Sequence, residues 1–295
     1  GFLISFIVMF FNTKFLWKMT PFLYLLGLGL MVLPLVFYSE SLVASTGAKN
    51  WVSIRGVTLF QPSEFMKISY ILMLSRVVVK FLQQNKKYER TIALDLFLIV
   101  KLALYTLPVL LLLALQSDLG TALVFAAIYC GIVLLSGVSW KIILPVFLTV
   151  SLLFTGFMLI FISNGGRAFL HDLGMPTYQI NRISAWLHPF EYAQTVTYQQ
   201  AQGQIAIGSG GLLGQGFNVS NLLVPVRESD MIFTVIAEDF GFLGSSLVIV
   251  IYLFLIHRML QITIKSNNQF YTYISTGLIM MLLFHIFENI GAVTG

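Results

Sequence analysis

The sequence predicts an all-α membrane protein, a polytopic bundle of transmembrane helices with a large extracellular loop, and three observations lead to this fold class. Hydrophobic residues make up 58% of the 295 residues, charged residues only 10%, and the mean hydropathy is +0.88, which excludes a soluble fold. The apolar residues form runs of about 20, the length that crosses a hydrocarbon core about 30 Å thick. These runs lack strict alternation, which favours helices over a closed barrel.

About eight such spans can be placed along the chain. They run from Gly1, from Pro21 to Tyr38, Glu64 to Leu82, Ile92 to Leu115, Leu119 to Leu135, Ile142 to Ile162, Ile232 to Ile256, and Gln269 to Val293. The first has no charged leader region and no small-residue cleavage site, so we interpret it as a shortened span and not as a signal peptide. We therefore expect residues 1–295 to be an excerpt of one integral membrane domain.

Basic residues in the short loops predict the orientation, because Lys and Arg favour the cytoplasmic side. One set of alternate loops carries Lys14, Lys18, Lys86, Lys87, Arg90, Lys141, Arg258 and Lys265. With this set inside, the long segment 163–231 faces outward. The net charge of +5 is mostly this bias, so no nucleic-acid partner is expected. The single Cys130, within an apolar run, excludes a disulfide framework and is interpreted as a packing residue.

Charged residues within apolar spans are costly and mark candidate sites. Glu64 and Lys67 lie three residues apart at the start of a span, behind Pro62, and so share one helical face. One interpretation is an interfacial ion pair with Glu64 at the helix N-terminus. The other is a polar wall of an outward-facing cavity. Lys101, near the middle of its span, is expected to extend its ammonium toward the cytoplasm.

Two further aspartates lie at predicted helix starts. Asp118, in a tight turn between two spans, either caps the following helix or belongs to a site. Asp230 directly precedes a span, with the same two interpretations, and Glu238 follows inside that span, where an acid needs a partner or a proton.

Segment 163–231 is too long to be a simple connector. Residues 183–190 and 199–207 are expected to form interfacial or re-entrant helices, and the glycine run 208–216 is expected to let the backbone bend at the membrane surface. This run lacks the Lys and Ser or Thr of a Walker motif, so nucleotide binding is not expected.

Several motifs in order make the sequence resemble the SEDS family, the RodA and FtsW proteins of cell elongation, division and sporulation. The matching pieces are Gly47-Ala48 with Trp51, Gln61 to Glu64 with Lys67, Gln116 to Thr121, Arg182 with Pro189, Tyr198-Gln199, Ile205 to Gly211, and Glu228 to Phe233 with Glu238 and Gly241. The chain departs from the family pattern at Asn50, where Arg is usual, at Ser117, where Pro is usual, and at Ser229, where Thr is usual. Family members have ten spans, of which these would be the second to the ninth, and the glycine run looks closer to RodA than to FtsW.

The resemblance implies a peptidoglycan glycosyltransferase that polymerises lipid II on the outer face of the bacterial cytoplasmic membrane, for elongation or division. It implies Asp230 as the catalytic residue, with Glu64 and Lys67 lining the same cavity, and a class B penicillin-binding protein as partner. The reaction would invert the anomeric centre, with Asp230 as general base. Lys67, Arg182, Arg227 or a divalent cation such as Mg²⁺ or Mn²⁺, with unknown ligands, would neutralise the pyrophosphate. Asp118, Glu238 and Trp51 are assigned structural or secondary roles.

Two rival functions use the same features. A flippase of lipid-linked cell-wall precursors would need a polar path across the membrane, and such transporters often contain inverted repeats, which the sequence does not show on inspection. A non-catalytic scaffold would use segment 163–231 as a docking surface and would tolerate Asp230→Ala.

Overall fold

A computed structural model describes most of the chain. The described residues are 12–40, 43, 47–54, 57–86, 89–163, 165–175, 177–187, 198–217 and 231–294. They form two compact units, one of residues 1–143 with 258–284, the other of residues 144–257 with 285–295. The first predicted span, which begins at Gly1, lies largely outside the described residues.

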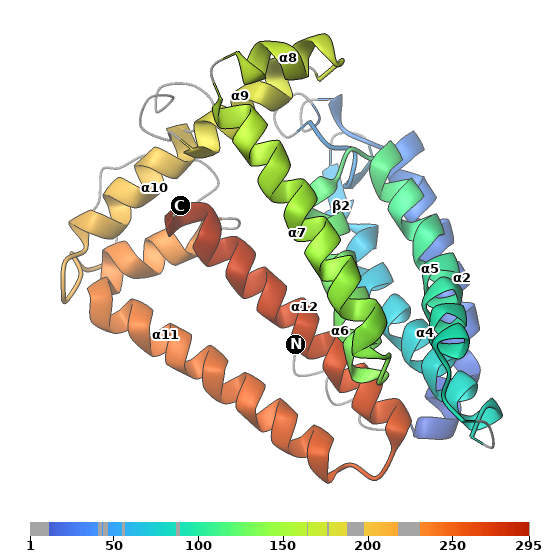
Figure 1. Ribbon diagram of the computed structural model, residues 1–295. Helices are drawn as coiled ribbons and strands as arrows, with labels where there is room; N and C mark the ends of the chain where they lie inside the picture. The colour runs from blue at the N-terminus through green and yellow to red at the C-terminus, as the bar shows by residue number, and fades with distance from the viewer. Residues whose placement is uncertain are drawn as a thin grey trace. The chain divides into compact units, whose positions relative to one another are not determined.

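The first unit is a helical bundle built around one central helix (Figure 1). Its helices are α2 (Thr13–Val36), α4 (Pro62–Gln84), α5 (Ile92–Leu115) and α6 (Leu119–Leu135), with parts of α11 and α12. Helix α4 contacts α2, α5 and α6, and most of its residues are buried. Its buried face carries Tyr70 and Leu74, and the Tyr70 hydroxyl lies 2.7 Å from that of Thr106 on α5.

Helix starts in this unit follow from local side-chain chemistry. Asn12 accepts a hydrogen bond from the Phe15 backbone N–H at 2.8 Å, and Thr91 accepts one from Leu94 at 3.4 Å, so both cap their helices. Helix α4 has no side-chain cap at Gln61 but begins with Pro62, whose fixed φ and missing N–H suit the first helical position. Four of the predicted spans therefore correspond to α2, α4, α5 and α6.

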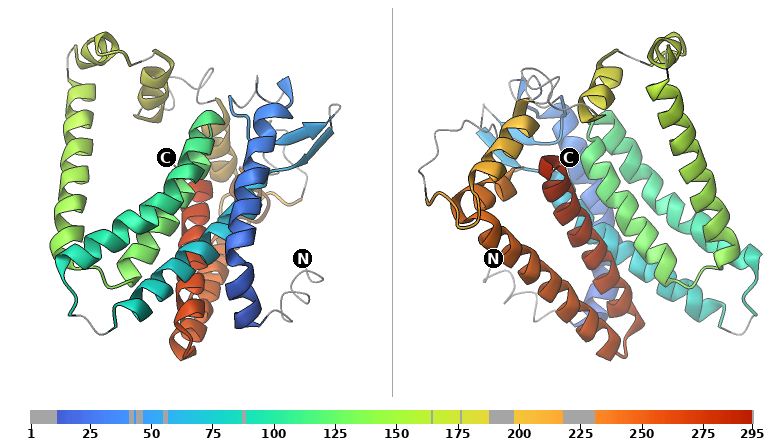
Figure 2. Two further views of the ribbon diagram at one scale, coloured as in Figure 1. Left: turned by 90° about the vertical axis from the view of Figure 1, so that its right-hand side faces the viewer. Right: turned by 60° about the vertical axis from the view of Figure 1, so that its left-hand side comes forward.

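The predicted all-α fold class is confirmed, and one short β-hairpin interrupts the otherwise helical unit. Strands β1 (Val52–Ile54) and β2 (Val57–Phe60) pair antiparallel beside the end of α2 (Figure 2). The Ser53 N–H donates to the Phe37 carbonyl at 3.0 Å, which joins the hairpin to the C-cap of α2. Short strands of mixed polarity between two apolar spans give little periodic signal, so the sequence did not reveal them.

Among the described residues, five helices are long and apolar enough to cross a membrane: α2, α5, α7 (Trp140–Ile162), α11 (Ile232–Lys265) and α12 (Gln269–Thr294). Helix α6 is shorter, and α4 is less apolar because it carries Glu64, Lys67, Arg76 and Lys80. A helix surrounded by other helices can carry polar groups that a lipid-facing helix cannot. Cys130, which we expected to pack, is exposed on α6.

Within the described residues, the second unit contains most of α7 and α11 and three short helices (Figure 1). The short helices are α8 (Gly166–Asp172), α9 (Thr177–Leu187) and α10 (Tyr198–Ser209). Phe161 of α7, Leu170 of α8 and Ile180 of α9 form a small buried cluster. Helices α9 and α10 overlap the two stretches, 183–190 and 199–207, that were expected to be helical.

The glycine run that follows α10 packs against a break in α11. Gly241 interrupts that helix with φ 66° and ψ −161°, a conformation that is essentially restricted to glycine. The N–H groups of Gln215 and Gly216 donate to the carbonyls of Glu238 and Asp239 at 2.9 and 3.1 Å. A Cβ atom on Gly214 would collide with the Asp239 carbonyl. The run is therefore a close-packed contact between backbones, and not only the flexible bend that we expected.

Candidate functional site

The candidate site in the first unit lies at what we call the hairpin end, where α2 and α5 end, α4 and α6 begin, and β1–β2 is attached. Lys67 and Glu64 form an ion pair there, with the Lys67 Nζ 2.9 Å from the Glu64 Oε1. The Lys67 side chain is only 3% exposed, whereas that of Glu64 is 61% exposed. The predicted pairing on one helical face is therefore confirmed.

This pair places an ammonium inside the bundle and a carboxylate at its surface. Burying an ammonium costs several kcal/mol unless opposite charge and hydrogen bonds compensate, and Glu64 supplies part of that compensation. Next to the pair, Ser63 is 2% exposed and its Oγ has no hydrogen-bond partner among the described residues. The start of α4 thus gathers a buried ammonium, an exposed carboxylate and a buried hydroxyl.

Asp118 caps α6, which is one of the two interpretations that the sequence left open. Its Oδ1 accepts from the Thr121 backbone N–H at 3.1 Å, and its Oδ2 accepts from the Thr121 hydroxyl at 2.9 Å. Asn50 donates from Nδ2 to the same Oδ2 at 2.8 Å. The Asp118 side chain therefore caps α6 and joins it to the segment before the hairpin.

The turn between α5 and α6 is held from both sides. The Gln116 side chain donates to the Met31 carbonyl of α2 at 2.6 Å, and the Lys49 N–H donates to the Gln116 carbonyl at 2.8 Å. Ser117 has φ 58°, a value that proline cannot adopt. The turn at Ser117 therefore has a different backbone conformation from a turn with proline at this position, which is the usual residue in the SEDS pattern. Trp51, 40% exposed, begins the hairpin segment that this turn supports.

In the second unit, the start of α11 is anchored immediately after Asp230 in the sequence. Met231 is 7% exposed and packs on Ala206 of α10, and its carbonyl accepts from the Thr234 hydroxyl at 2.6 Å. The Phe233 N–H donates to Asn289 Oδ1 of α12 at 3.4 Å. Glu238, two turns further along, is 1% exposed beside the glycine run.

Three predicted site residues are not placed. Asp230 and Arg227 lie outside the described residues, and for Arg182 only the backbone in α9 is described. The structure therefore brings Glu64 together with Lys67, and Asp118 together with Asn50, while the roles of Asp230, Arg227 and Arg182 stay predictions.

Sequence reasoning missed an ion pair between a buried aspartate and a partly exposed arginine at the opposite end of the first unit. Asp95, 3% exposed, accepts from Arg90 Nε at 2.7 Å and from the Ser139 N–H at 2.8 Å. It thereby ties the start of α5 to the turn before α7. The signal in the sequence was Asp95 in the first turn of a helix that Thr91 caps, with Arg90 close by. We had counted Arg90 only as a loop charge.

No group of three or more His, Cys, Asp or Glu side chains that could hold a metal ion occurs within the described ranges. The divalent cation therefore has no described ligand set and stays a prediction.

Comparison with known proteins gives a consistent family. The family described as "Cell cycle protein", which covers FtsW, RodA and SpoVE, matches residues 1–295. The peptidoglycan glycosyltransferase MrdB of Escherichia coli K12 is 33% identical over 93% of this chain and 68% of its own length. Stage V sporulation protein E of Bacillus subtilis is 28% identical over 84% of this chain and 63% of its own length.

Solved structures share the fold. A chain from a study of "polymerization and crosslinking by a peptidoglycan synthase complex" matches with a TM-score of 0.75 and 25% identity, covering 99% of this chain and 75% of that one. The rod shape determining protein RodA of Thermus thermophilus matches with a TM-score of 0.63 and 24% identity, over 100% of this chain and 73% of its own.

Proposed function

Because the chain belongs to the family of FtsW, RodA and SpoVE, we propose that it is a peptidoglycan glycosyltransferase that polymerises lipid II on the outer face of the cytoplasmic membrane. The observation that carries this proposal is the 33% identity, over 93% of the chain, to a relative that is itself named a peptidoglycan glycosyltransferase. The multi-pass membrane fold supports it, since lipid II is delivered from the bilayer.

The proposed reaction transfers a sugar from a lipid pyrophosphate to a sugar hydroxyl. The acceptor hydroxyl attacks the anomeric carbon, its proton passes to the carboxylate of Asp230, and the bond from that carbon to the pyrophosphate oxygen breaks. A single displacement inverts the centre, so one general base suffices and no sugar is bound covalently to the protein.

The leaving pyrophosphate needs positive charge, and the hairpin end offers one buried source. Lys67 sits on a helix held by neighbours on three sides, so its ammonium is fixed before the ligand arrives. A preorganised cation in a poorly hydrated site stabilises developing negative charge more than a solvated one does. Glu64 would orient that ammonium.

The anchored start of α11 supports Asp230 as the base. Met231 packs on α10, and the next turn is bonded to α12. A catalytic group adjoining a fixed helix start loses little entropy when it aligns with the acceptor. In this proposal Asp118 stabilises the fold and does not contact the substrate.

A partner that crosslinks the new strands is also proposed. The structurally similar chain comes from a complex that coordinates polymerisation with crosslinking, and a class B penicillin-binding protein would supply the second activity.

The experiment follows glycan strand formation from purified lipid II by the full-length protein with that partner. We expect Lys67→Gln to lower kcat/KM by about 10- to 100-fold, because a charge-assisted contact to the pyrophosphate is lost. Lys141→Gln, which removes an exposed charge at the opposite end of the unit, should keep the wild-type rate.

The same preparations, placed in vesicles, are assayed for movement of lipid II between leaflets. If the wild type moves lipid II between leaflets but forms no strands, the polymerase proposal is wrong and the flippase function is favoured. If the wild type shows neither activity, the scaffold function is favoured.

A further inference from the structure

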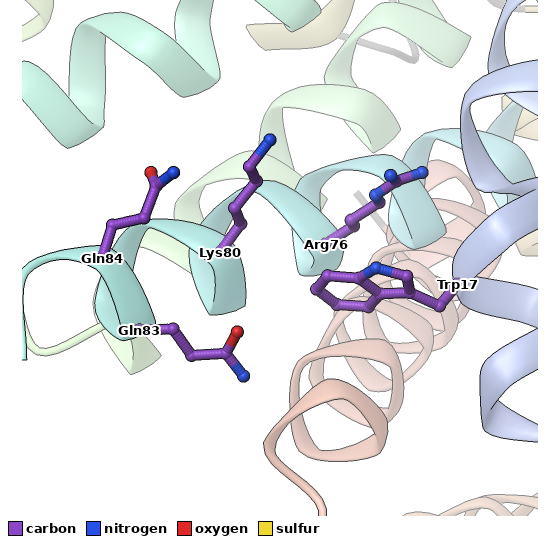
Figure 3. A pocket seen from close by; sticks show the side chains of 5 residues that line it. All are labelled: Trp17, Arg76, Lys80, Gln83 and Gln84. Atoms are coloured by element: carbon purple, nitrogen blue, oxygen red, sulfur yellow. The ribbon is translucent and has the colours of Figure 1, made fainter.

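A polar pocket of about 400 Å³ lies at the end of the first unit opposite the hairpin, which we call the basic end (Figure 3). It is lined by Trp17 of α2 and by Arg76, Lys80, Gln83 and Gln84 of α4. The described lining thus contains two cations and two amides but no acid. None of these residues takes part in the proposed reaction.

The pocket is a built feature of two packed helices. Arg76, Lys80 and Gln84 recur every four residues, so they share one face of α4, as Figure 3 shows. The Arg76 guanidinium lies 5.3 Å from the centre of the Trp17 ring, a cation–π contact. Trp17 in turn meets the ring of Phe270 edge-on at 5.1 Å, which fixes the indole.

One polar atom in this pocket calls for a partner. Arg76 Nη1 is buried and has no hydrogen-bond partner among the described residues. A buried guanidinium donor without an acceptor is costly, and such donors are normally satisfied by protein, water or a ligand. Because the lining that the structure describes has no carboxylate, an acceptor from outside this lining would meet this need.

The position of the pocket identifies the kind of acceptor. Arg76 lies eight residues before the last residue of α4, Gln84, which corresponds to about 12 Å along a helix axis. Lys80 is exposed one turn nearer the end, and Lys14 and Lys18 stand at the start of α2. A tryptophan next to basic residues at a helix end is typical of the lipid headgroup region. Phosphate is the acceptor that both Arg and Lys bind best there.

We propose that this pocket binds the phosphate of an anionic phospholipid, with Arg76 donating to the phosphate and Lys80 adding charge. Gln83 and Gln84 would bond the hydroxyls of a glycerol headgroup, which favours phosphatidylglycerol over a zwitterionic lipid. In the proposed orientation the lipid belongs to the cytoplasmic leaflet. That assignment rests on the proposed topology, but binding itself does not depend on glycosyl transfer.

The test titrates the full-length protein in detergent with phosphatidylglycerol or phosphatidylcholine and counts bound lipids by native mass spectrometry. We expect wild type to prefer phosphatidylglycerol. Arg76→Gln should weaken phosphatidylglycerol binding about tenfold, and Lys80→Gln about fivefold. Lys86→Gln removes an exposed charge outside the pocket at the same end and should change binding less than about twofold.

Three results would overturn the proposal. They are unchanged binding in Arg76→Gln, an equal loss in Lys86→Gln, and full displacement of the lipid by millimolar inorganic phosphate, which would indicate a soluble anion as the ligand. If Arg76→Gln does not fold, phosphatidylglycerol binding by Lys80→Gln and Trp17→Leu is compared instead with binding by wild type and Lys86→Gln. Unchanged binding in both of these variants would then overturn the proposal. The lipid-binding test contains no lipid II, so a negative result in it leaves the polymerase proposal unaffected. A negative result in the polymerisation assay likewise leaves the lipid-binding proposal unaffected.

Discussion

At the scale of single residues, two acidic side chains at the hairpin end do different things. Asp118 has its carboxylate oxygens bonded to Thr121 and Asn50, so a substrate would have to compete with the fold for it. Glu64 instead presents a mostly exposed carboxylate, bonded to a buried ammonium. Sequence spacing predicted the Glu64–Lys67 pair because residues three apart share a helical face. It could not predict the Asn50–Asp118 bond, whose partners are 68 residues apart.

Asp118→Ala should destabilise the protein and affect catalysis only through the fold. Loss of a cap and of a charge-assisted hydrogen bond costs about 2 to 3 kcal/mol together, which lowers the Tm by about 4 to 12 °C for a unit of this size. Thermal unfolding in detergent measures this shift. Asp172→Ala is the control, since that side chain is 84% exposed and its removal should leave the Tm unchanged. Equal Tm values for Asp118→Ala and wild type would show that the cap contributes nothing.

At the scale of elements, the apolar runs predicted most of the helices because each run is long and its period is unambiguous. The hairpin β1–β2 was missed because its strands are only 3 and 4 residues long. The central place of α4 was missed as well, since its polar residues look unfavourable until the surrounding helices are known. Arg76 and Lys80 were passed over for that reason, although charges within an apolar span were the signal that pointed to Lys67.

The break in α11 leads to a prediction about glycine. Gly241→Ala should destabilise the second unit by about 1 to 3 kcal/mol, because its φ of 66° and ψ of −161° are strained for any residue with a Cβ. A Cβ there would also contact the backbone of Leu212. Gly156→Ala in α7, where a Cβ meets open space, is the matched control and should be neutral or slightly stabilising. Limited proteolysis after thermal challenge measures both, and equal behaviour of the two variants would contradict the packed-break account.

At the scale of the whole molecule, the orientation in the membrane is the claim on which the location of the chemistry depends. Starting from a Cys130→Ala background, Leu213→Cys and Lys86→Cys each provide one exposed thiol. A maleimide that cannot cross membranes should label Leu213→Cys in intact cells and Lys86→Cys only after permeabilisation, because the basic loops favour the cytoplasm. The reverse pattern would place the glycine run inside the cell and would contradict the proposed outward-facing reaction.

The most direct test of the central claim is lipid II polymerisation by the full-length protein with its partner, comparing wild type with Asp230→Asn and Asp230→Ala. Asp172→Asn, an exposed carboxylate in α8, serves as the control for loss of an acidic side chain. We predict that wild type and Asp172→Asn make glycan strands at equal rates, and that both Asp230 variants, folded with unchanged Tm, lose at least about 100-fold in rate. Normal strand formation by the Asp230 variants would contradict the assignment of the general base.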